Sequence, residues 1–71
     1  MDTIKIFAER LKELRQERGI GQIALAKEIG VGKSIVSVWE TEKSEPTLNS
    51  LVKLARFFDV SLDYLCGIKD C

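Results

Sequence analysis

Residues 22–40 have the sequence QIALAKEIGVGKSIVSVWE, which predicts two short helices joined by a tight turn. The first helix covers residues 22–29, and its apolar stripe consists of Leu25, Ala26 and Ile29. Gly30 ends this helix, because glycine adopts the positive φ that a helix end requires. The second helix is expected to begin at Gly32 or Lys33 and to run to about Thr41.

Two short helices separated by a turn that contains glycine form the helix-turn-helix pattern. The helices cross closely, so the first needs a small side chain at the contact, and Ala26 provides it. The second helix must be held at a fixed angle, which the apolar residues Val31, Val36 and Trp39 can do. Its opposite side then stays free to enter the major groove of DNA, which is wide enough for one helix.

The flanking sequence predicts three more helices and no strand. Apolar residues recur at helical spacing over residues 4–18, with Thr3 as the expected cap and Gly19 as the stop. After Pro46, Thr47 caps a helix that holds Leu48 to Phe58, and Ser61 caps a last helix from Ser61 to Cys66. The expected architecture is therefore one all-α, five-helix domain over residues 1–71, with the helix-turn-helix at 22–40.

Composition excludes several classes of protein. The chain has 71 residues and a net charge of zero, from 11 basic and 11 acidic side chains, so strong nonspecific binding of nucleic acid is not expected. It has no apolar run long enough for a membrane span and no secretion signal, so we expect no membrane partner and a cytoplasmic location. There is no histidine and no paired cysteine motif, so no metal, cofactor or small-molecule substrate is expected, and the chain is not expected to be an enzyme. A disulfide between Cys66 and Cys71 is not expected either.

Three segments together resemble the lambda-repressor-like, Cro-type (XRE) helix-turn-helix family. They are LKELRQERGI at 11–20, the motif at 22–40, and EPTLNSLVKLARFFDVSLDYL at 45–65. The resemblance implies a five-helix, lambda-repressor-like DNA-binding domain. It also implies a transcriptional regulator that binds specific double-stranded DNA, most commonly a repressor that occupies a palindromic operator as a homodimer.

The resemblance further implies roles for individual residues. Gln22 would hold a phosphate and brace a neighbouring base-reading side chain. The base-reading positions are Lys33, Ser34, Ser37 and Val38. The loop that grips the DNA backbone contains Thr41, Lys43 and Ser44. Arg15 and Glu40 match a salt bridge of the family that positions the third helix without touching a base.

The chemistry of the base-reading positions suits this role. Lys33 can donate to guanine O6 and N7, and the hydroxyls of Ser34 and Ser37 can meet either donors or acceptors. Val38 would contact a thymine methyl group. The free main-chain N–H groups at Gly21 and Gly32 would hold phosphates at two helix starts.

Several positions depart from the family pattern. Gly21 and Gly32 stand where a capping residue is usual, and Glu42 stands where a glycine commonly ends the third helix and adds a charge that repels phosphate. Ile23 and Ile35 stand where polar residues are more usual, and together with Val38 they form a candidate surface for another protein. The alternative function is therefore a protein-interaction module, antitoxin-like or anti-repressor-binding, with weakened DNA binding.

The expected dimer surface is the C-terminal end, where apolar area is offered by Leu62, Tyr64, Leu65 and Ile68. The sequence is compatible with a repressor or an activator. It is also compatible with a regulator from a phage, from a restriction–modification system or from the host. The operator sequence and the full length of the protein stay open as well.

Overall fold

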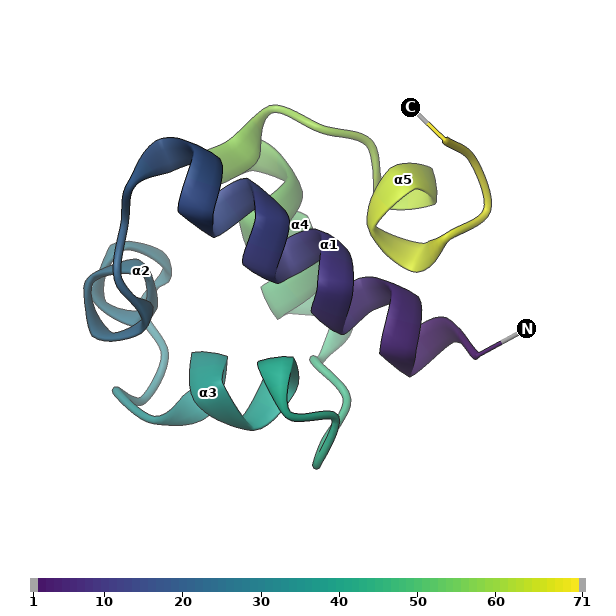
Figure 1. Cartoon of the computed structure of the whole chain (residues 1–71). Coiled ribbons are helices and arrows are strands. Elements are labelled where there is room, and N and C mark those ends of the chain that lie inside the picture. Colours follow the sequence, from purple (N-terminus) through teal and green to yellow (C-terminus); the bar gives the residue numbers. More distant parts are fainter. Residues whose placement is uncertain (1, 71) are drawn as a thin grey trace.

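Five α-helices make up the computed structural model, which describes residues 2–70 and contains no strand within that range (Figure 1). The helices are α1 (Thr3–Arg18), α2 (Gln22–Ile29), α3 (Ile35–Glu40), α4 (Leu48–Phe58) and α5 (Leu62–Cys66). The all-α, five-helix class predicted from the sequence is confirmed. No helix within the described range is both long and apolar enough to cross a membrane.

All five helices end in the same hydrogen-bonded turn. A residue with a positive φ follows each helix, directly after α1, α2, α4 and α5 and one residue later after α3. The N–H of this residue and the next N–H donate back to carbonyls of the last helical turn. Glycine occupies this position after α1, α2 and α5, whereas Glu42 and Asp59 occupy it after α3 and α4. The glycines therefore end helices at Gly19, Gly30 and Gly67, as the sequence indicates.

The helix starts differ in two places from the prediction. Asp2, and not Thr3, caps α1, because its carboxylate accepts from the main-chain N–H of Lys5 at 3.1 Å. The third helix begins at Ile35 and not at residue 32 or 33, because the chain first makes a turn in which Ile35 N–H donates to the Gly32 carbonyl at 3.0 Å. The predicted caps at Thr47 and Ser61 are confirmed.

The core lies where all five helices meet. Its buried members are Phe7, Leu11, Leu25, Ala26, Ile29, Val36, Trp39, Leu54, Ala55, Phe58 and Leu65. Trp39 of α3 meets Phe7 of α1 edge to face, with 6.2 Å between ring centroids. Ala26 is fully buried where α2 approaches α3, so the prediction of a small side chain at this crossing is confirmed.

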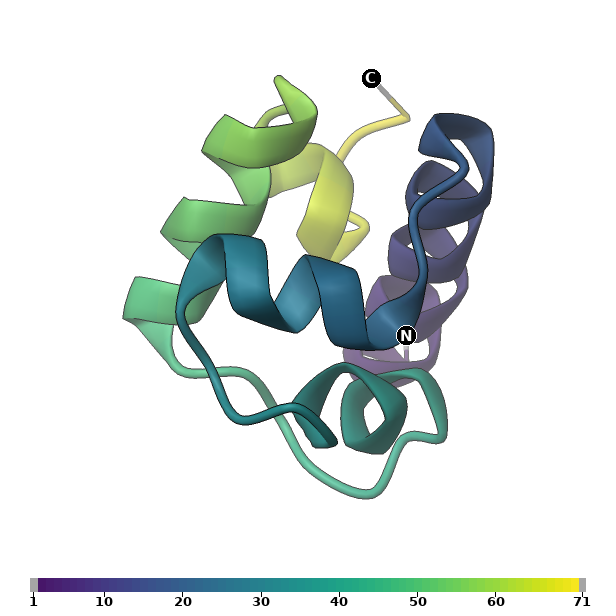
Figure 2. The same cartoon turned by 90° about the vertical axis from the view of Figure 1, so that its left-hand side faces the viewer.

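The packing leaves one side of α3 uncovered. α3 packs against α1 and α2, and in Figure 1 it forms the lower edge of the molecule together with the loop that follows it. Figure 2 shows α2 lying across the top of α3, which is the helix-turn-helix arrangement. The inward side of α3 is anchored by Val36 and Trp39, so its outer side and the adjoining loop are available to a partner.

Two apolar residues are more buried than the sequence suggests. Leu65, expected on a dimer surface, is fully buried in the core, because α5 packs against both α1 and α4. Ile35, expected to be exposed, is half-buried and packs against the core at the start of α3. Tyr64, also expected on that surface, is half-buried with its ring against Arg10, whereas Leu62 and Ile68 are exposed. The expectation for Cys71 falls outside the described residues.

Candidate nucleic-acid interface

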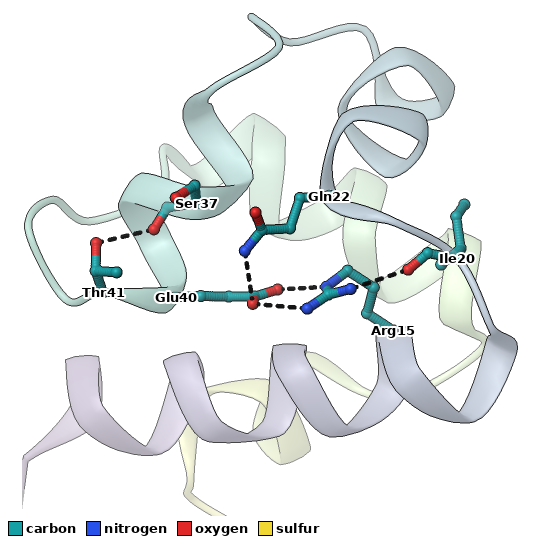
Figure 3. A network of polar contacts seen from close by, with 6 residues as sticks. All are labelled: Arg15, Ile20, Gln22, Ser37, Glu40 and Thr41. Carbon is teal, nitrogen blue, oxygen red and sulfur yellow. Dashed lines mark hydrogen bonds and ion pairs between the residues drawn. The ribbon is translucent and has the colours of Figure 1, made fainter.

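A largely buried ion pair lies between α1 and the end of α3. The guanidinium of Arg15 donates to both carboxylate oxygens of Glu40, from Nε at 2.7 Å and from a terminal nitrogen at 3.0 Å (Figure 3). The two side chains are only 14% and 5% exposed. The hydrogen bond with Glu40 raises the pKa of Arg15, although burial works in the opposite direction. The predicted pair is therefore formed, and its bidentate geometry is the strong kind.

The carboxylate of Glu40 also receives a hydrogen bond from α2. Nε2 of Gln22 donates to Oε1 of Glu40 at 3.0 Å, and Arg15 further donates to the main-chain carbonyl of Ile20 at 3.1 Å. Figure 3 shows these side chains converging from three different helices and the α1–α2 connection. Glu40 is the last residue of α3 and Gln22 the first of α2, so this network fixes the angle of α3 against α1 and α2.

The base-reading candidates divide into two environments. Lys33 and Ser34 are exposed in the turn before α3, although the sequence predicted them within the helix. Ser37 and Val38 lie within α3 and are half-buried. Within the described residues, the polar side-chain atoms of Lys33, Ser34 and Ser37 make no ion pair or hydrogen bond.

The loop after α3 offers fewer free donors than predicted. The Thr41 hydroxyl donates to the main-chain carbonyls of Ser37 at 2.9 Å and Val38 at 3.2 Å. The Ser44 hydroxyl donates to the Glu45 carbonyl at 3.3 Å. Both hydroxyls would have to rotate to donate to a phosphate. The exposed ammonium of Lys43 needs no such change.

The helix starts near this surface lack side-chain caps, as expected from Gly21. No side chain bonds to the first turn of α2 or of α3. The N–H groups of the first turn of α2 are therefore free for an anion. Gly32 precedes a turn and does not begin α3, so the second phosphate position expected at a helix start is not formed there.

Arg10 has a structural role that the sequence does not indicate. Its guanidinium lies 4.4 Å from the ring centroid of Tyr64 and donates to the main-chain carbonyls of Tyr64 and Lys69, the latter at 2.7 Å. Arg10 thereby holds α5 and the following residues against α1. No local pattern signals such a contact, because the partners lie more than 50 residues apart in the sequence.

Comparison with known proteins identifies related sequences and folds. The family model HTH_3, described as helix-turn-helix, matches residues 11–65. The uncharacterized HTH-type transcriptional regulator YobD of Bacillus subtilis is 40% identical over 65 residues, which cover 92% of this chain and 58% of YobD. The HTH-type transcriptional regulator ImmR of the same organism is 37% identical, over 86% of this chain and 48% of ImmR. The chain thus spans 58% or less of the length of these relatives.

Solved structures show the same arrangement of helices. The c2 repressor of phage P22, in complex with a synthetic operator, superposes with a TM-score of 0.84 at 33% identity, over 90% of this chain and 97% of the repressor chain. The restriction–modification controller protein C.AhdI of Aeromonas hydrophila superposes with a TM-score of 0.79 at 32% identity, over 87% of this chain and 94% of the controller. The sequence-based family resemblance is confirmed.

Proposed function

Since this chain belongs to the HTH_3 helix-turn-helix family of DNA-binding transcriptional regulators, we propose that it binds specific double-stranded DNA and acts as a repressor. The observation that carries the proposal is the likeness to the P22 c2 repressor, whose solved structure contains a synthetic operator. Membership in this family also supports the sequence-based exclusion of an enzyme. Action on operator DNA would place the protein in the cytoplasm.

In the proposed complex the outer side of α3 enters the major groove. Lys33 and Ser34, in the turn before α3, would meet base edges first, and Ser37 would follow one turn later. Lys33 would donate to a guanine and Val38 would contact a thymine methyl group. The Arg15–Glu40 pair would act by holding α3 at the required angle, with no contact to a base.

The DNA backbone would be held on both sides of α3. Gln22 uses one N–H of its amide on Glu40 and has a second N–H for a phosphate. Lys43 would neutralise a phosphate on the other side, joined by Thr41 and Ser44 after rotation of their hydroxyls. Few basic side chains lie on this surface, so the affinity for DNA depends on where those side chains are placed.

We further propose that the regulator is a homodimer through its C-terminal end. Leu62 and Ile68 are 38% and 66% exposed. Sedimentation of wild type and Leu62→Asp tests this point, since the aspartate should give monomers while the fold, measured by circular dichroism, is retained. A wild type that sediments as a monomer at high concentration would contradict it.

The function is tested by selecting random duplex DNA with the purified chain. Enrichment of a palindrome with half-sites about one helical turn apart would support a dimeric, sequence-specific regulator. Affinity for the selected site should fall steeply with salt, because phosphate neutralisation releases counterions. Failure of any sequence to enrich at low salt, with a folded chain, would refute the proposal.

Two observations favour the second candidate, a protein-interaction module. Ile23 is 64% exposed beside Gln22, and the net charge is zero. The apolar surface is smaller than the sequence suggests, however, because Ile35 packs against the core. A folded chain that selects no DNA would favour this function. We propose in either case that residues 1–71 act as one helix-turn-helix domain.

A further inference from the structure

Glu42 holds a backbone conformation that its side chain does not favour. Its φ is 62°, in the left-handed region that favours glycine. Its own N–H donates to the Trp39 carbonyl at 3.1 Å, and the next N–H, of Lys43, donates to the Val38 carbonyl at 3.1 Å. Glu42 therefore occupies the glycine position of the turn that ends α3.

The ends of the other four helices show that a glutamate at this position is unusual. Glycine fills the position after α1, α2 and α5, and Asp59 fills it after α4 with a φ of 54°. Aspartate is several-fold enriched in this conformation, because its short side chain bonds to the nearby backbone. Glutamate has no such advantage. Glu42 is thus the only long side chain at a left-handed position among residues 2–70.

No contact of the Glu42 carboxylate offsets this backbone strain within the described residues. The carboxylate is exposed and makes no hydrogen bond or ion pair within the described part of the chain. It lies between Thr41 and Lys43, in the loop proposed to hold the DNA backbone. A residue that strains the backbone at such a surface, without a structural contact, points to a functional role.

We propose that Glu42 limits the affinity of this surface for DNA, by setting an unpaired negative charge against the phosphate backbone. The proposal rests on the proposed DNA binding. Glu42 follows the C-terminal end of α3, whereas the N-terminal part of a recognition helix meets the bases, so its charge acts on phosphates. Phosphate contacts supply essentially all of nonspecific binding. The carboxylate therefore keeps the chain from remaining on sequences that its base-reading residues do not recognise.

The test separates charge from backbone strain with two variants and two matched controls. Glu42→Gln removes the charge and keeps the strain, whereas Glu42→Gly removes both. Asp59→Asn and Asp59→Gly make the same changes at the end of α4, which Figure 1 places at the opposite end of the molecule from α3. Binding to a random-sequence duplex and to the selected operator is measured by fluorescence anisotropy over a range of salt concentrations. Thermal unfolding is measured on the same samples.

Glu42→Gln and Glu42→Gly should both tighten binding to random duplex by about 1.5- to 5-fold at low salt, the range for an exposed charge interaction. The gain should shrink as salt rises, because the Debye length falls to about 8 Å at physiological ionic strength. Glu42→Gly alone of this pair should also raise Tm, by about 4–8 °C, through loss of the left-handed strain. The Asp59 variants should leave DNA affinity unchanged.

Unchanged or weaker binding of random duplex by Glu42→Gln would overturn the proposal. Weaker operator binding with relaxed preference at one base pair would overturn it as well, and would assign Glu42 to base reading. An equal gain from Asp59→Asn would show that net charge alone is responsible, which also overturns it. Failure of the proposed function is a separate result, because wild type itself would then show no salt-dependent binding of duplex.

Discussion

Replacement of Glu40 by alanine should strongly destabilise the fold. The substitution leaves the guanidinium of Arg15, only 14% exposed, without its two closest acceptors, and it removes the acceptor of Gln22 as well. Loss of one partner of a buried pair costs about 3–5 kcal/mol, and the residual exposure of Arg15 favours the lower end. A 71-residue domain has a free energy of unfolding of about 4–10 kcal/mol, so this is a large part of the total.

The measurement is a double-mutant cycle on thermal and urea unfolding. A loss of about 3 kcal/mol should lower Tm by about 12–24 °C in a domain of this size. Arg15→Ala should also destabilise, and the double variant should lose less than the sum, by about 1–3 kcal/mol. Lys69→Ala is the control, because its ion pair with Asp63 is long at 3.7 Å and exposed, and its loss should cost less than about 1 kcal/mol. Additive effects of the Arg15 and Glu40 substitutions would refute the reasoning.

The pH dependence of the same variants provides a second check. The hydrogen bond with Glu40 raises the pKa of Arg15 above its unfolded value. The stabilisation that comes from Arg15 is therefore fully present below the unfolded pKa and is lost only as pH rises through the folded pKa, in strongly alkaline solution. The cost of Glu40→Ala should stay constant between about pH 6 and 9. A steep change within this window would mean that another group titrates with the pair.

Three further predictions concern single side chains. Lys33→Ala should cost about 1–3 kcal/mol in operator binding and relax preference at one position per half-site, and an unchanged selected sequence would remove Lys33 from the base-reading set. Lys43→Ala should weaken binding to all duplexes alike and lower the slope of log K against log salt by about 1, whereas an unchanged slope would mean that Lys43 contacts no phosphate. Thr47→Ala should lower the free energy of unfolding by about 1 kcal/mol in a urea titration, because the Thr47 hydroxyl accepts from the Ser50 N–H at 3.1 Å; no loss would mean that this cap contributes nothing.

The sequence by itself determined the five helices, most of their ends and the helix-turn-helix. These features follow from signals that act over a few residues, namely apolar spacing, caps such as Thr47 and stops such as Gly30. The family resemblance added the Arg15–Glu40 pair, which no local signal specifies. Its partners lie 25 residues apart, and the structure confirms it.

Local signals were weakest where tertiary packing competes with them. The start of α3 was predicted two or three residues too early, because a turn from Gly32 to Ile35 resembles a first helical turn in sequence. Ile35 and Leu65 were assigned to surfaces, yet both pack inward. Periodicity indicates which residues share a face of a helix, but it does not indicate how wide a face the neighbouring helices cover.

Apart from the Arg15–Glu40 pair, only the tertiary structure decided which polar groups meet across the helices. Gln22 reaches Glu40 across 18 residues of sequence, and Arg10 reaches Tyr64 across 54. Such contacts form because the packing of α1, α2, α3 and α5 brings these residues together, and the pattern of side chains within one helix does not indicate which residues of another helix lie nearby. The same packing decides which side of α3 stays uncovered, and that uncovered side is the proposed DNA-binding surface.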